Sequence, residues 1–209
     1  MAVARGLRRE PRQARSRARV AQILAAADAI LAADGVDALT VRRIADRAGV
    51  PVGTLYQFFP DKGAVIDATA RGYIAEFDAA IGELVASAER GDGDWSDPVG
   101  RLVDTFAALY RSRPGYVALW TGRHLSPELA RADDANNQVI AAGVRRILVS
   151  LAAVSDTPAL DLAAQVAVRT ADALLHYAFA KSPRGDDAVL GELKRLLRPY
   201  LASLTTRRT

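Results

Sequence analysis

The sequence predicts an all-α protein with about nine helices. Alanine and leucine are abundant, runs of β-branched residues are short, and no segment alternates apolar and polar residues as a half-buried strand does. Half of the 209 residues are hydrophobic, so the chain can bury a sizeable core. Its length suits a small N-terminal module followed by a helical domain, or a single large domain.

The first predicted helix covers residues 16–33 and follows residues 1–15, an arginine-rich segment without periodicity that we interpret as a flexible arm. Asp34-Gly35 ends this helix, because glycine readily adopts the left-handed conformation of a C-cap. One face of the helix is apolar and consists of Val20, Ile23, Leu24, Ala27, Ile30 and Leu31.

Two short helices and one long helix are predicted next. Thr40 is a suitable N-cap for a helix over residues 41–48, and Gly49-Val50-Pro51 forms a tight turn. A third helix covers residues 52–59. Pro60-Asp61 then interrupts the chain, and Asp61 caps a fourth helix over residues 62–90.

Loop-forming residues separate the remaining helices. The segment GDGDWSD at 91–97 is a loop by composition, and prolines or capping residues start most of the later helices. The predicted ranges are 98–112, 114–122, 127–153 capped by Ser126, 159–181 and 186–204.

Composition excludes several classes of protein. The chain has no cysteine, so it has no disulfide, thiolate zinc site or cysteine nucleophile. No segment approaches the roughly 18 apolar residues of a membrane span. The basic N-terminus is not followed by the compact apolar region and small-residue cleavage site of a signal peptide. We expect a cytoplasmic protein without a membrane partner.

The positive charge is concentrated at the N-terminus. Residues 1–62 hold 11 basic and 6 acidic side chains, a net charge of +5, whereas the remainder carries −1. This excess would attract a polyanion such as DNA, although a solvated basic tail is the alternative. Most of it comes from Arg5, Arg8, Arg9, Arg12, Arg15, Arg17 and Arg19.

Residues 41–58 have the pattern of a helix-turn-helix. Ala45 is small where the two helices would cross, and Gly49 stands at the turn, where a positive φ is required. Apolar residues at the spacing that packs one helix on the other are Ile44, Val50, Leu55 and Phe58. An ordinary helical hairpin is the alternative, but it does not require all of these features in this order.

Residues 35–62, GVDALTVRRIADRAGVPVGTLYQFFPDK, resemble the DNA-binding domain of the TetR family, the tetracycline-repressor-like regulators. The resemblance is strong over about residues 17–70 and implies a basic arm at 1–15, a helix-turn-helix domain at 16–62 and a ligand-binding and dimerisation domain at 63–209. The helix over 62–90 would link the two domains.

The resemblance also implies which residues contact DNA. Thr40 corresponds to the cap that also donates to a phosphate, and Lys62 to the lysine that binds phosphate at a helix start. Arg43 would add a phosphate contact or be solvated. Further DNA-contacting positions are Arg42, Val52, Gly53, Thr54, Tyr56 and the candidate base reader Gln57.

One residue departs from the family pattern. Pro51 stands where the family usually has a serine or a similar capping residue, and proline supplies no capping oxygen. With Val52 and Gly53 next, the start of the recognition helix is apolar. We therefore expect phosphate contacts, arm arginines and thymine-methyl contacts to contribute much of the DNA affinity.

The last two helices are expected to form a homodimer interface, as the resemblance implies. Their apolar residues exceed what one packing surface requires, although a core within one chain explains part of the excess. The leucines at helical spacing in the last helix are Leu190, Leu193, Leu197, Leu201 and Leu204.

A pocket for a small-molecule effector is expected in the C-terminal domain, with aromatic residues that alternatively belong to the core. On the helix over 159–181, Gln165, Arg169, Asp172 and His176 share one face. This face either lines the pocket or forms a solvated or dimer-interface network. The candidate pocket residues are Phe77, Phe106, Tyr110, Trp120, His124, Arg169, Asp172 and His176.

Nothing in the sequence indicates an enzyme, a cofactor or a metal site. There is no phosphate-binding glycine loop, nucleophile elbow or HExxH motif, and two histidines far apart are a weak metal signal. The function predicted is that of a transcriptional repressor released from a palindromic operator in double-stranded DNA by an effector. A ligand-independent DNA-binding protein and a transcriptional activator are the alternatives.

Overall fold

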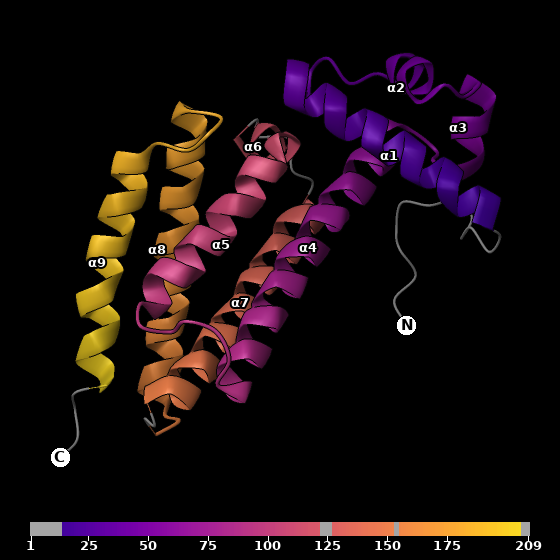
Figure 1. Cartoon of the computed structure of the whole chain (residues 1–209). Coiled ribbons are helices and arrows are strands. Elements are labelled where there is room, and N and C mark those ends of the chain that lie inside the picture. The colour runs from indigo at the N-terminus through magenta and orange to yellow at the C-terminus, as the bar shows by residue number, and fades with distance from the viewer. Residues whose placement is uncertain (1–13, 122–126, 153–154, 206–209) are drawn as a thin grey trace. The chain divides into compact units, whose positions relative to one another are not determined.

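The computed structural model describes residues 14–121, 127–152 and 155–205 of the chain (Figure 1). Every regular element in these residues is a helix, which confirms the predicted all-α class. The helices of the described part are α1 (Ala14–Asp34), α2 (Val41–Ala48), α3 (Val52–Phe58), α4 (Lys62–Arg90), α5 (Pro98–Ser112), α6 (Pro114–Thr121), α7 (Pro127–Ala152), α8 (Pro158–Lys181) and α9 (Asp187–Thr205).

The predicted caps determine several helix ends. The Thr40 side chain accepts a hydrogen bond from the backbone N–H of Arg43, and Asp61 Oδ1 accepts one from the N–H of Ala64 at 2.8 Å. Helix α8 begins at Pro158, one residue earlier than predicted, because Thr157 caps it through the N–H of Leu160. Helix α1 begins at Ala14, so the last two residues of the expected arm are helical.

Packing divides the chain into two compact units. The first comprises the chain up to Tyr73 together with residues 113–130, and therefore includes α6 as well as α1, α2, α3 and the first part of α4. The second comprises residues 74–112 and 131–209. The domain ranges 16–62 and 63–209 stay a prediction, because compactness does not test which part folds by itself.

In the first unit, α6 packs closely against α1. A Cβ added at Gly115 of α6 would lie 2.4 Å from Asp28 Oδ1 and 2.5 Å from Tyr73 Oη, so only glycine fits there. Tyr73 of α4 donates a hydrogen bond of 2.5 Å to Asp28 of α1, and its ring meets Tyr116 of α6 edge to face. These contacts join α1, α4 and α6 through one small polar and aromatic cluster.

In the second unit, α8 and α9 lie side by side and α5 packs against both (Figure 1). Ion pairs join α9 to the start of α5 and the loop before it, through Arg198 with Asp97 and Lys194 with Asp104. The predicted leucine row of α9 is buried by the chain itself at Leu190, Leu193, Leu197 and Leu201; the side chain of Leu204 lies outside the described residues. This row therefore forms core. Within the described part, no helix is long and apolar enough to cross a membrane.

Candidate nucleic-acid interface and effector region

The predicted helix-turn-helix is formed by α2 and α3. Ala45 is fully buried where the helices approach, and Gly49 has a φ of +64°, the left-handed conformation that glycine tolerates best. The N–H of Val50 donates to the Ala45 carbonyl at 3.0 Å, which closes the turn. Ile44 and Leu55 are fully buried, so apolar packing fixes the angle of α3 to α2.

Helix α3 presents an apolar outer surface. Pro51 precedes it without any side-chain capping hydrogen bond, as its lack of an oxygen dictates. Val52 and Tyr56 are large hydrophobic side chains that are 37% and 43% exposed. Gly53 beside them is open, with nothing within 4 Å of a Cβ placed there. This surface lets a base edge or thymine methyl group approach the helix closely.

Cationic groups lie near both ends of the motif. Arg42 is exposed on α2 and forms no ion pair with a described residue, whereas Arg43 pairs with Asp34 at 2.5 Å. Lys62 is exposed at the first position of α4, and a helix N-terminus favours a bound anion. Of these three cations, Arg43 is the one whose charge a neighbour already partly compensates.

The second unit contains an aromatic cluster around Tyr110 of α5. Phe77 and Phe106 stack at 5.6 Å, and Tyr110 meets Phe77 edge to face at 5.7 Å. Phe179 and His176 of α8 lie 5.0 and 5.4 Å from Tyr110. Three predicted aromatic pocket residues, Phe77, Phe106 and Tyr110, are thus buried, and Phe77 contacts the other two.

His176 is the polar centre of this cluster. Its Nδ1 lies 2.9 Å from the Asp172 carbonyl and 3.3 Å from the Asp172 carboxylate, and Tyr110 Oη lies 3.4 Å from the ring nitrogens. Burial lowers the pKa of His176, but the hydrogen bond and charge of Asp172, with Asp133, outweigh burial and raise the pKa overall. The imidazolium is therefore favoured inside an otherwise aromatic environment.

Residues 93–205 match the family described as "Tetracyclin repressor-like, C-terminal domain", and residues 23–69 match "Bacterial regulatory proteins, tetR family". The chain belongs to the TetR family. It is therefore a DNA-binding transcriptional regulator, as the helix-turn-helix pattern predicted.

Individual relatives agree with this assignment. A TetR-family regulator from Streptomyces coelicolor is 30% identical and has a TM-score of 0.67, with 90% of this chain and 98% of that chain covered. A Mesorhizobium loti structure shares the fold at 17% identity and a TM-score of 0.71, with 92% and 97% covered. The class A tetracycline repressor of Escherichia coli transposon 1721 is 35% identical over 100 residues, 47% of this chain and 44% of that protein. The chain thus aligns with less than half of that repressor.

The polar face predicted on α8 of this TetR-family chain divides into two parts. Gln165 and Arg169 are exposed and pair with Asp161 and Asp134, whereas Asp172 and His176 face the aromatic cluster. The hydrogen bond to Asp134 raises the pKa of the Arg169 guanidinium. The structure therefore groups Asp172 and His176 with Tyr110, and it leaves Arg169 at the surface.

Two further predicted pocket residues are not part of this cluster. Trp120 belongs to the first unit, where it stacks on Tyr116 at 4.2 Å. His124 lies outside the described residues.

Sequence reasoning missed several polar residues. Asn136 and Asn137 of α7 are buried, and Asn136 Oδ1 accepts no hydrogen bond from any described group. Asp28 and Tyr73 form the polar contact between α1 and α4. The Asn136-Asn137 pair is the sequence signal that could have revealed buried polar groups, because it interrupts the otherwise aliphatic core face of its helix.

Proposed function

We propose that this TetR-family regulator is a repressor that binds a palindromic operator as a homodimer and leaves it when an effector binds. The exposed surface of α3 is the observation that most supports DNA reading. A recognition helix with Val52, Gly53 and Tyr56 outward favours close contact with the major groove, and apolar side chains there suit thymine methyl groups.

The proposed DNA contacts divide into two kinds. Val52, Gly53 and Tyr56 lie against base edges. Polar and cationic residues around them bind the DNA phosphate backbone and set the register of the helix in the groove. These positioning residues are Thr40, Arg42, Arg43, Thr54 and Lys62.

The proposed dimer interface consists of the outward faces of α8 and α9. Leu162 and Tyr177 of α8 are 62% and 52% exposed, and Leu196 of α9 is 52% exposed. Large apolar side chains exposed on two neighbouring helices are characteristic of a surface that a partner covers. A two-fold dimer places two recognition helices about one helical turn of DNA or a multiple apart, which requires a palindromic operator.

The proposed effector site includes Tyr110, Asp172 and His176 with Phe77 and Phe106. Their rings form an apolar, aromatic surrounding, and the His176–Asp172 pair adds a hydrogen-bonding and charged group within it. An effector held there must bind the state with poor DNA affinity more tightly than the state with high affinity, because a population shift needs that difference.

One experiment tests the proposal in two stages. Duplexes are selected from a randomised library with the purified chain, and compounds are then screened for release of the selected duplex, measured by fluorescence anisotropy. Enrichment of a palindrome and release by a compound whose effect His176→Ala abolishes support the proposal. Selected DNA that no compound releases would favour a ligand-independent DNA-binding protein. Tighter DNA binding with the compound would contradict release by an effector.

A further inference from the structure

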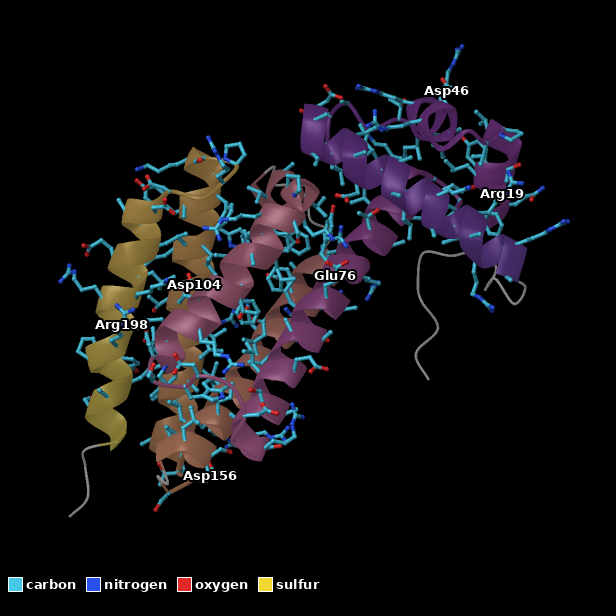
Figure 2. The ribbon with its side chains drawn as sticks, viewed as in Figure 1. Arg19, Asp46, Glu76, Asp104, Asp156 and Arg198 are labelled. Atoms are coloured by element: carbon cyan, nitrogen blue, oxygen red, sulfur yellow. The ribbon has the colours of Figure 1, made fainter. Side chains whose placement is uncertain are left out.

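An open cleft of about 380 Å³ lies within the first unit between the start of α1 and α3. Figure 2 labels Arg19 on α1, beside α3. The residues that line it are mostly cationic or polar: they carry two guanidinium groups, two hydroxyl groups and one amide, and none of these described residues carries a carboxylate. The lining residues are Arg15, Ser16, Arg19, Pro51, Thr54, Gln57 and Phe58.

No described side chain compensates the charge of either cleft arginine. Arg15 and Arg19 are exposed, stand one helical turn apart and form no ion pair with any described residue. Arg43, by contrast, is paired with Asp34. Two uncompensated guanidinium groups above hydroxyl and amide donors form a site for an oxyanion, because guanidinium binds phosphate oxygens through several N–H groups at once.

The cleft also divides the surface of α3. At about 100° per residue, Pro51, Thr54 and Gln57 fall on the side of the helix toward α1, as the cleft lining shows. Val52, Gly53 and Tyr56 do not line the cleft and belong to the outward side. Gln57 is thus next to arginines and a hydroxyl rather than at the centre of the outward surface.

We infer that this cleft binds one phosphodiester of the DNA backbone, held by Arg15 and Arg19 of α1 together with Thr54 and Gln57 of α3. Gln57 is then a positioning residue, and base discrimination belongs to Val52, Gly53 and Tyr56. The inference rests on the proposed DNA binding and adds α1 to the interface. The alternative is the sequence-based hypothesis that Gln57 reads a base.

The test measures how salt weakens binding of a labelled duplex of about three helical turns and arbitrary sequence. Arg15→Gln and Arg19→Gln should each lower the slope of log affinity against log salt, and the double variant should lower it by about 0.9 per bound protomer, the contribution of one phosphate contact. Arg17→Gln is the matched control, because this arginine is exposed on the same helix but does not line the cleft. It should leave the slope near the wild-type value.

A second measurement tests the role of Gln57. Gln57→Ala should weaken binding to a library-selected duplex and to its scrambled version by the same factor, whereas Tyr56→Ala should reduce the ratio of the two affinities. If Gln57→Ala also reduces the ratio of the affinities for the selected and scrambled duplexes, Gln57 reads a base and its assignment to the cleft is overturned.

Two controls separate the possible failures. If the wild type binds duplex DNA and the cleft variants match Arg17→Gln, the phosphodiester site is wrong while the proposed function stands. If the wild type binds no duplex, the proposed function itself fails. Inorganic phosphate at constant ionic strength should compete no better than chloride, and stronger competition that Arg19→Gln removes would show that the cleft binds a free anion instead.

Discussion

Replacing Gly115 by alanine tests the packing that joins α6 to α1 and α4. The new Cβ would lie 2.4 Å from Asp28 Oδ1, 2.5 Å from Tyr73 Oη and 3.0 Å from the Asp28 carbonyl oxygen. Backbone and a buried tyrosine leave little room to move, so the Asp28–Tyr73 hydrogen bond must lengthen or break.

The expected cost follows from two effects. Overpacking a close contact costs about 1–3 kcal/mol, and loss of a hydrogen bond to a charged group costs about 1.5–3 kcal/mol. The helix propensity of alanine returns up to about 1 kcal/mol. Partial relaxation makes the first two costs overlap, so we expect Gly115→Ala to lower the free energy of unfolding by about 2–3 kcal/mol.

Urea unfolding followed by circular dichroism measures this change, with Gly72→Ala as the control. Gly72 lies inside α4 in the same unit, is exposed and has nothing within 4 Å of an added Cβ. Its replacement should stabilise the protein by about 0.5–1 kcal/mol. If Gly115→Ala leaves the free energy of unfolding within about 0.5 kcal/mol of wild type, the close packing of α6 on α1 is refuted.

Three further predictions concern the Asp172–His176 pair of α8, the proposed dimer interface and the cap of α2. The pKa of His176 is raised in the folded state, so its stabilising contribution is complete below the unfolded-state pKa of about 6.5 and is lost as pH rises through the folded-state value. Asp172→Asn should flatten this pH dependence of the unfolding free energy. An unchanged curve would show that Asp172 does not stabilise the charged form of His176. Leu162→Glu should halve the mass measured by sedimentation, whereas Val139→Glu, an equally drastic change at an exposed position of α7, should not. Equal masses for both variants would refute the dimer face. Thr40→Val removes the cap of α2 and should cost about 1 kcal/mol in urea unfolding, so a variant as stable as wild type would show that the cap contributes little.

Local chemistry explains why so much of the fold was predictable from the sequence. Thr40, Gly49 and Asp61 act within a few residues along the chain, and each performs its predicted role. Apolar periodicity identified Ile44 and Leu55 as buried residues for the same reason.

Predictions that depend on distant contacts were less complete. The leucines of α9 repeat at helical spacing whether a partner subunit or the chain's own core covers them, and it is the core that buries Leu193. Arg169 and His176 share a helix face, yet a carboxylate on α7 holds one at the surface and the ring of Tyr110 covers the other. The cleft between α1 and α3 depends on how residues more than 30 positions apart in sequence pack, which periodicity does not show.

Selection of duplexes from a randomised library, followed by anisotropy titration at fixed salt, tests the central claim most directly. We predict enrichment of a two-fold symmetric sequence that the chain binds at least about 10³-fold more tightly than its scrambled version. Tyr56→Ala should reduce that ratio. Failure to enrich any sequence, or equal affinity for the selected and scrambled duplexes, would contradict sequence-specific DNA recognition by α3.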